Sequence, residues 1–172
     1  MLIIDDYLSL AEHKLVINTM LDQAWFPWFY LPSKTRQGVA AGGHDEKYNF
    51  QFIHPFYSDF NFVSQHAKML QPFNDRLKPR AIVRIKANLS PCTDTIIKFD
   101  NHIDVPDFIG KTAIYYVNSN NGKTVFADGT KVDSKENRMV IFDSHLVHSG
   151  TTCTDEKVRC VINFNYIEKI SS

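Results

Sequence analysis

The run Asn101-His102-Ile103-Asp104 holds the first residues that could do chemistry. On an extended backbone His102 and Asp104 point to the same side, so they can offer an imidazole nitrogen and a carboxylate oxygen to one metal ion. Ile103 then points the other way, into packing. Because a His-x-Asp spacing also arises by chance, the pattern needs support from its structural context.

His148 and Arg159 supply that context. His148 follows a predicted strand at 138–142 and precedes Ser149-Gly150. Two His and one carboxylate on a β scaffold bind a metal on one side and leave adjacent positions open, as in non-haem Fe(II) sites. Arg159, in the last predicted strand, offers a rigid and permanently charged guanidinium that suits a carboxylate.

Each of these residues also has a plainer interpretation. A lone His is usually a surface residue or a satisfied core residue. Asp104 before Val105-Pro106 could organise a turn, and Arg159 could pair weakly with Asp155 or Glu156 at the surface. The order and spacing of the whole set favour the metal site.

Composition sets the limits of the fold and the partners. With 172 residues, 44% hydrophobic and 22% charged, the chain suits one domain with a real core. The formal net charge of zero argues against electrostatic capture of nucleic acid or anionic lipid. The N-terminus lacks a basic segment and no apolar run is long enough to span a membrane, so we expect a cytoplasmic protein. Three sparse cysteines predict reduced thiols: Cys92, Cys153 and Cys160.

Two helices are expected in the first half of the chain. Ser9 and Glu12 form a capping-box pattern, and the apolar spacing after them predicts a helix over about 10–23. A second helix is predicted over about 59–78, where Pro72 could kink or divide it. The polar, glycine-bearing stretch Ser33 to Lys47 predicts a mobile surface loop, or alternatively a lid over an active site.

Short strands dominate from Ala81 onward. β-branched and alternating runs separated by turn residues predict an antiparallel sandwich or barrel. The expected strands are 81–89, 95–99, 112–117, 124–126, 138–142 and 158–166, with turns at 90–91, 118–122, 128–129 and 149–150. N-terminal helices packed on one sheet of this body give an α+β fold with a jelly-roll core.

The ordered motifs of the second half resemble one known family, the Fe(II)/2-oxoglutarate-dependent oxygenases, in their prolyl-4-hydroxylase-like branch. The resemblance covers about 84–166, and the opening Ile4-Asp5-Asp6-Tyr7-Leu8-Ser9 also resembles the start of small members. The matching parts are His102-x-Asp104, Ala113-Ile114-Tyr115-Tyr116-Val117-Asn118, Gly122-x-Thr124-x-Phe126, Asn137-Arg138-x-Val140-x-Phe142, His148-x-Gly150 and Arg159. Chains of this size also resemble oxygenases encoded by bacteriophages, which would work in the host cytoplasm.

The resemblance implies a fold and a set of cofactors. The fold would be a cupin-like double-stranded β-helix, with residues 1–172 as a single domain. His102, Asp104 and His148 match the ligands of Fe(II), and Arg159 matches the residue that binds the C5 carboxylate of 2-oxoglutarate. Tyr116 matches a tyrosine that hydrogen-bonds the same carboxylate, although it could be a plain sheet aromatic. Dioxygen would be the second cosubstrate, and ascorbate could support turnover.

Several positions depart from the family pattern. The strand at 84–89 lacks the tyrosine that prolyl hydroxylases often carry there, and Asn88 could replace it as a donor to 2-oxoglutarate. Lys86 shares that face and could contact the substrate. Lys157 is a rival to Arg159 for the carboxylate. His145 competes with His148, but Gly150 after His148 fits the family better, so His145 is expected either to support the metal ligands without binding the metal or to have a structural role.

The implied reaction is hydroxylation of an organic substrate, with a prolyl or other amino-acid side chain favoured, and release of succinate and CO2. One alternative is the same chemistry on a nucleobase or small metabolite. Another is a non-catalytic, metal-binding jelly-roll module. The expected partners are the cosubstrate and a peptide or small molecule, without membrane and, given the neutral composition, without nucleic acid; the oligomeric state stays open.

Overall fold

A large antiparallel sheet forms the body of the computed structural model, which describes residues 1–33, 46–106 and 108–169. Its strands lie in the order β1-β9-β6-β11-β5-β3-β2, and β4 pairs with β3. Their bounds are β1 Leu2–Ile4, β2 Phe29–Leu31, β3 Gln51–Ser58, β4 Asn61–Phe62, β5 Ala81–Pro91, β6 Lys111–Tyr116, β9 Arg138–Asp143 and β11 Val158–Ile167.

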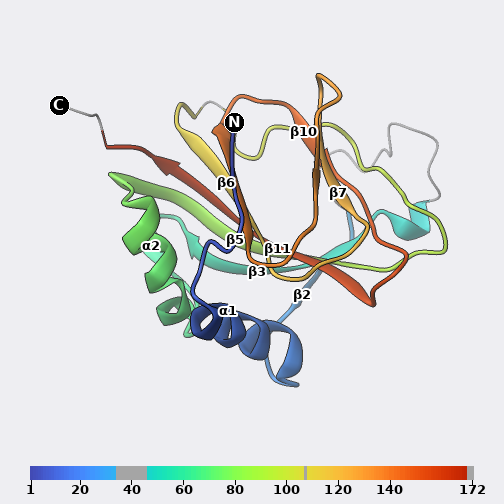
Figure 1. The fold of residues 1–172 in the computed structure, drawn as a ribbon, viewed down its shortest axis with the longest axis horizontal. Helices are drawn as coiled ribbons and strands as arrows, with labels where there is room; N and C mark the ends of the chain where they lie inside the picture. Colours follow the sequence, from blue (N-terminus) through green and yellow to red (C-terminus); the bar gives the residue numbers. More distant parts are fainter. Residues whose placement is uncertain (34–45, 107, 170–172) are drawn as a thin grey trace.

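A small sheet lies against one face of the large one, and the helices cover the other face (Figure 1). The small sheet has the order β10-β7-β8, with β7 at Lys123–Phe126, β8 at Lys131–Asp133 and β10 at His148–Gly150. Two facing antiparallel sheets with helices outside one of them are a jelly-roll double-stranded β-helix. The α+β, cupin-like fold class is thereby confirmed.

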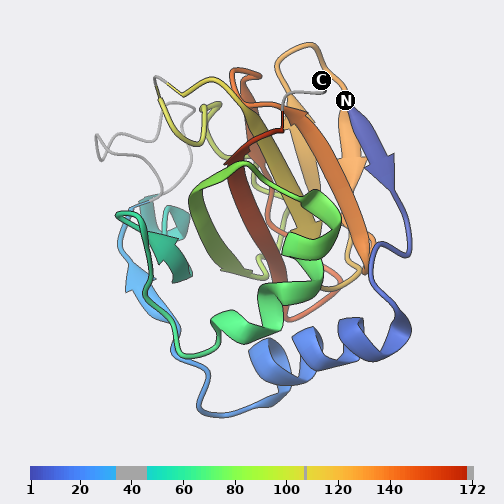
Figure 2. The ribbon, with the colours of Figure 1, turned by 90° about the vertical axis from the view of Figure 1, so that its left-hand side faces the viewer.

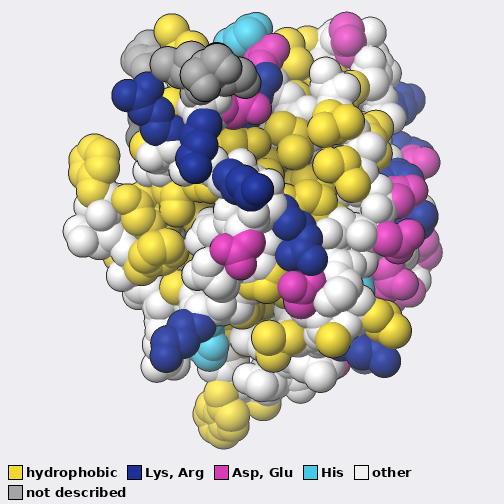
Figure 3. Space-filling model, turned by 60° about the vertical axis from the view of Figure 1, so that its left-hand side comes forward, with side chains coloured by type: hydrophobic (Ala, Val, Ile, Leu, Met, Phe, Trp, Pro, Cys, Tyr) yellow, Lys and Arg dark blue, Asp and Glu magenta, His cyan; other side chains and the backbone are white. Residues whose placement is uncertain are grey.

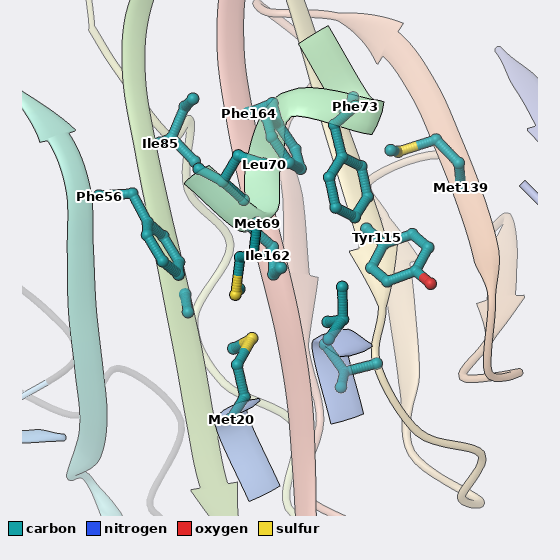
Figure 4. Close-up of a cluster of buried hydrophobic side chains, with 14 of the residues drawn as sticks. Met20, Phe56, Met69, Leu70, Phe73, Ile85, Tyr115, Met139, Ile162 and Phe164 are labelled. Atoms are coloured by element: carbon teal, nitrogen blue, oxygen red, sulfur yellow. The ribbon is translucent and has the colours of Figure 1, made fainter. Parts of the chain in front are cut away.

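Strand alternation divides the interior into two cores. On β11, Ile162 and Phe164 face the helices, while Val161 faces the small sheet. The core under the helices is the larger one, and Figure 4 shows Met20 and Met69 meeting across it beside aromatic side chains. The strands are thus held by burial on the helix side, which leaves the other side free to carry polar groups.

The first helix begins where the sequence predicts. Ser9 Oγ accepts from the Glu12 N–H at 3.4 Å, and the Ser9 N–H donates to the Glu12 carboxylate at 2.8 Å, which completes the capping box. α1 spans Leu10–Ile17, and the chain continues through the π-helical turn Asn18–Asp22. Figure 2 looks onto the helices where they cover the large sheet.

The second predicted helix is correct only in its last part. A tight turn with positive φ at Asp59 and Phe60 (51° and 63°) joins β3 to β4, so 59–66 is not helical. A 3-10 turn at Ala67–Leu70 leads into α2, Gln71–Leu77. Pro72 lies in the first turn of α2, where its missing N–H costs nothing, and therefore it begins the helix instead of kinking it.

Other local predictions fail where long-range pairing decides the structure. The expected strand 95–99 contains only one isolated bridge, from Lys98 to Thr151. Ser149-Gly150, expected as a turn, lies within β10. Strands β1, β2, β3, β4 and β8 were not predicted, because they are short or lack clear alternation.

Three further expectations concern features outside the sheets. Residues 34–45 of the stretch Ser33 to Lys47 lie outside the described residues, and Glu46–Tyr48 forms one 3-10 turn. All three cysteines are free thiols. Within the described residues, no helix combines the length and the apolar character needed to cross a membrane.

Candidate metal centre

His102, Asp104 and His148 come together although His148 is distant from the other two in sequence. One possible ligand atom from each lies within 4.8 Å of the others. Backbone bonds fix the approach: the His102 N–H donates to His148 O at 2.8 Å, and the His148 N–H donates to His102 O at 3.0 Å. The bridge between the segment after β5 and strand β10 therefore positions both imidazoles.

Each imidazole has one nitrogen held by a backbone carbonyl. His102 Nδ1 lies 3.1 Å from Asp100 O, and His148 Nδ1 lies 2.9 Å from Leu146 O. These carbonyls favour the tautomer with the proton on Nδ1, which leaves the Nε2 lone pair free for a metal. The Nε2 atoms lie 3.9 and 4.0 Å from the carboxylate oxygens of Asp104, so all three donors face one point.

Asp104 is surrounded by nitrogen donors. Its side chain is only 5% exposed, with Arg84 Nη2 at 3.3 Å and the amide nitrogens of Asn163 and Asn165 at 3.4 and 3.3 Å. Burial raises the pKa of Asp104, but the charges of His148 and Arg84 outweigh it and hold that pKa below its usual value. The carboxylate is therefore ionised, as a metal ligand must be.

The two histidines differ in exposure. The side chain of His102 is half-exposed, whereas that of His148 is buried. Burial lowers the pKa of His148 against the opposing effect of Asp104. The imidazole of His148 is thus neutral around pH 7, which is the form that binds metals.

Arg159 is buried on the same inner face. Its Nε donates to Ser134 Oγ at 2.9 Å, its Nη2 donates to Thr124 Oγ1 at 3.1 Å, and its guanidinium lies 5.7 Å from the centre of the Tyr116 ring. Burial lowers the pKa of Arg159, but an arginine stays charged at neutral pH. No acidic side chain among the described residues pairs with this cation, so its geometry suits an incoming anion.

The arginine lies close to the histidine end of β10. A Cβ at Gly150 would stand 3.4 Å from Arg159 Nη1. Gly150 is two residues beyond His148, roughly 7 Å along an extended chain. A Cβ at Gly122 would stand 2.7 Å from Arg159 Cδ and 2.8 Å from the backbone oxygen of Thr152, so this position has no room for a side chain. The guanidinium therefore lies near the strand that carries His148.

A cavity of about 280 Å³ opens at the same end of the molecule. Its walls include Phe50, Ser90 and Thr152. Ser90 pairs with Arg159 across β5 and β11, so the cavity lies next to the strand position of the arginine. There is room for a small molecule at this edge of the sheets.

Tyr116 and Asn88 also face inward. Tyr116 is fully buried, and its O–H donates to Thr124 Oγ1 at 2.8 Å, so it shares a partner with Arg159. Asn88 is half-buried, and its Oδ1 is a buried oxygen without a hydrogen-bond partner among the described residues. Lys157 and His145 are both exposed and stand outside the three-residue group.

The residues that surround the candidate ligands were missed from the sequence. Asn163, Asn165 and Arg84 contact Asp104, while Thr124 and Ser134 hold Arg159. One signal was available: Arg159, Asn163 and Asn165 recur on one face of a strand whose other face is apolar. Polar residues at a spacing of two in a buried strand indicate an internal site.

Among the comparisons with known proteins, only the one with solved structures gives matches. No protein-family model matches the chain, and no curated protein matches it. Solved structures do match, including a prolyl hydroxylase from Trichoplax adhaerens in complex with a hypoxia inducible factor oxygen degradation domain peptide. That structure has a TM-score of 0.68 at 14% identity, over 97% of this chain and 83% of the other.

Two bacterial structures agree with it. An oxidoreductase of the 2OG-Fe(II) oxygenase family from Burkholderia pseudomallei has a TM-score of 0.64 at 14% identity, over 99% of this chain and 88% of its own. A prolyl-4-hydroxylase from Pseudomonas putida has a TM-score of 0.58 at 13% identity, over 96% and 91%. This chain therefore has the fold of 2OG-Fe(II) oxygenases and prolyl hydroxylases, and it carries a His-Asp-His group suited to iron.

Proposed function

We propose that this chain is an Fe(II)- and 2-oxoglutarate-dependent oxygenase formed by a single domain over residues 1–172. His102, Asp104 and His148 would hold the iron, and Arg159 would bind the C5 carboxylate of 2-oxoglutarate. The observation that carries the proposal is a buried guanidinium with no acidic partner among the described residues, next to a group with the ligand set of Fe(II) oxygenases. Bound iron would supply the oxidation chemistry that protein side chains lack.

The protein's own residues would bind and orient. The neutral imidazole of His148 and the ionised Asp104 have the protonation states that ligation requires. Tyr116 lies beside Arg159 and could turn its O–H from Thr124 toward the cosubstrate carboxylate. Asn88 faces the same interior, and its amide nitrogen is the second candidate donor to 2-oxoglutarate. We prefer Arg159 to Lys157 because Lys157 is exposed.

For the substrate we propose an amino-acid side chain, with proline favoured. Similar folds include prolyl hydroxylases, and the Trichoplax protein is in complex with a peptide. In the balanced reaction, a C–H bond of the substrate becomes C–OH with one atom of O2. The other atom enters succinate as 2-oxoglutarate loses CO2. A small metabolite is the alternative substrate for the same machinery, and ascorbate would be a supporting reductant.

The test is turnover of 2-oxoglutarate with isotope-labelled oxygen. Protein supplied with Fe(II) is incubated with 2-oxoglutarate under ¹⁸O2, alone and with separate pools of prolyl peptides and small metabolites. We expect succinate carrying one labelled oxygen atom, and one labelled product in the pool that contains the substrate. Two results would contradict the oxygenase proposal. One is release of succinate that carries no labelled oxygen, and the other is the absence of succinate in every incubation.

A further inference from the structure

Two basic residues occupy the inner face of β5 beside the candidate ligands. Arg84 pairs in register with Asn165 of β11, and Lys86 pairs with Asn163. Both asparagines contact Asp104, so Arg84 and Lys86 stand one strand away from the carboxylate. The Arg84 Nε also donates to Asn165 Oδ1 at 3.1 Å, which fixes the arginine on this face.

Lys86 is a half-buried cation that lacks an acidic hydrogen-bonding partner within the described part of the chain. Burial first, and then the neighbouring charge of Arg84, lowers the pKa of Lys86 to about 8, although Asp104 opposes the shift. Removing a charge from water without a counter-ion is costly. Such a residue beside a candidate site usually has a functional reason, and an anion would supply the missing partner.

The charges of the proposed complex leave this pair uncompensated. The two charges of Fe(II) and the one of Arg159 offset Asp104 and the two carboxylates of 2-oxoglutarate. Arg84 and Lys86 then remain as two cations on one wall of the site. If Asp104 binds iron, its negative charge is partly offset by the metal, so it neutralises the positive charge of Arg84 less well.

Lys86 is too far along the strand to bind the same carboxylate as Arg159. Arg159 pairs with Ser90, which is four residues from Lys86 on β5 and therefore about 13 Å away along the strand. Arg159 thus lies near one end of the strand pair, whereas Lys86 lies near its middle, paired with one of the asparagines that contact Asp104. Arg159 is buried, whereas Lys86 is only half-buried and is therefore the more accessible of the two cations.

Three polar atoms on β5 and β11 lack a hydrogen-bond partner within the described residues. Asn88 Oδ1, Asn163 Oδ1 and Arg84 Nη2 are buried without a hydrogen-bond partner among the described residues. Arg84 Nη2 does lie 3.3 Å from Asp104 Oδ1, as an ion pair not aligned for a hydrogen bond. Figure 3 also shows Lys and Arg side chains following one another across one face of the molecule, although the net charge is zero.

We propose that the substrate carries an anionic group, a carboxylate or a phosphate ester, which Lys86 binds with support from Arg84. This inference rests on the proposed oxygenase function, because it takes the substrate to approach the metal from the side opposite Arg159. Lys86 then determines specificity, and the oxidised C–H bond lies within a few bonds of the anion.

The test separates this idea from the oxygenase proposal. Protein loaded with 2-oxoglutarate and Mn(II), a metal suited to the same ligands, is titrated with acetate, methyl phosphate or acetamide. Binding near the metal is followed by faster relaxation of the methyl protons of each probe. We expect saturable binding of at least one anion and none of acetamide. Lys86→Met should weaken that anion about tenfold, and the exposed Lys131→Met should leave it unchanged.

The other outcomes each overturn the proposal. Equal binding of acetamide would remove the charge selectivity, and equal anion binding by Lys86→Met would assign the probe to the metal. Fe(II) and 2-oxoglutarate together are expected to give a visible absorption band without oxygen. Loss of that band in Lys86→Met would make Lys86 a cosubstrate ligand. Absence of the band in the unaltered protein would count against the oxygenase function itself.

Discussion

The two faces of β11 have opposite chemistry. One face packs under the helices and is apolar, with Cys160, Ile162, Phe164 and Tyr166 all buried. The other face turns toward the small sheet and carries Arg159, Val161, Asn163 and Asn165. Because side chains alternate along a strand, stability and the candidate site occupy neighbouring residues without sharing contacts.

The contrast between the two faces explains how the molecule can hold buried charge. The helix-side core supplies the burial energy that keeps β5, β6 and β11 together. The inner face can then carry polar groups that find no hydrogen-bond partner within the described part of the chain, among them Asn163 Oδ1 and Asn88 Oδ1. Substitutions on the inner face should therefore change binding, and substitutions on the helix face should change stability.

The largest effect is expected at Asp104. Asp104→Ala removes the only acidic member of the proposed ligand set and should abolish succinate formation coupled to substrate oxidation. The secondary structure should persist, because Asp104 belongs to neither apolar core. Succinate release and circular dichroism check the two statements. Succinate formation at the original rate would refute the ligand assignment.

The next effect compares two adjacent residues on β11. Phe164→Ala should lower the free energy of unfolding by about 3–5 kcal/mol, because loss of the buried ring leaves a cavity. The centroids of the Phe164 and Phe73 rings are 5.0 Å apart. Asn163→Ala should cost about 1.5 kcal/mol or less, since it removes only weak hydrogen bonds to Asp104. Urea denaturation of the metal-free variants measures both. Equal losses of unfolding free energy in the two variants would show that both faces of β11 contribute equally to stability.

Arg159 gives an intermediate effect on the inner face. Arg159→Ala should raise the 2-oxoglutarate KM by roughly 10- to 100-fold, the value of a charge-assisted hydrogen bond, with a smaller change in kcat. The exposed Lys157→Ala is the matched control and should keep the original KM. If Lys157→Ala raises the KM instead, the cosubstrate carboxylate binds Lys157.

The smallest effect is a pH dependence on the helix side. His54 is buried, with Nδ1 2.8 Å from Pro27 O and Nε2 2.7 Å from Ser64 Oγ, and burial lowers its pKa. The unfolded chain then binds the proton more readily, so stability falls as the pH drops below about 6.5 toward the folded pKa. One proton limits this slope to about 1.4 kcal/mol per pH unit.

Denaturation at a series of pH values checks the role of His54. The unfolding free energy of the unaltered protein should decline between pH 7 and pH 5, and His54→Gln should show a smaller decline. His13 and His148 also have pKa values lowered by burial, so part of the slope should remain. An unchanged decline in His54→Gln would show that the pH dependence does not come from His54.

The sequence predicted the strands whose alternation is regular. β5 and β11 were found because one face of each is apolar, and α1 was found from the Ser9–Glu12 capping box. The predicted helix was wrong over residues 59–66, where apolar side chains recur at helical spacing. The positive φ angles at Asp59 and Phe60 end β3 in a turn that periodicity does not detect.

The sequence predicted the candidate metal ligands but not the residues that surround them. Spacing and resemblance pointed to His102, Asp104 and His148, and the fold brings these three together. The partners Arg84, Asn163 and Asn165 depend on the register between β5 and β11. Register follows from packing of the whole sheet, so no local pattern could assign these contacts in advance.

The most direct test of the proposed iron site is the amount of Fe(II) that the protein binds. Equilibrium dialysis without oxygen, with 2-oxoglutarate present, should give one Fe(II) per chain. His102→Ala and His148→Ala should each bind less than about one tenth of that amount, the size of effect that loss of a charged or ligating partner produces. The neighbouring exposed His145→Ala should still bind one. Full binding by His148→Ala, or loss of binding in His145→Ala, would contradict the site.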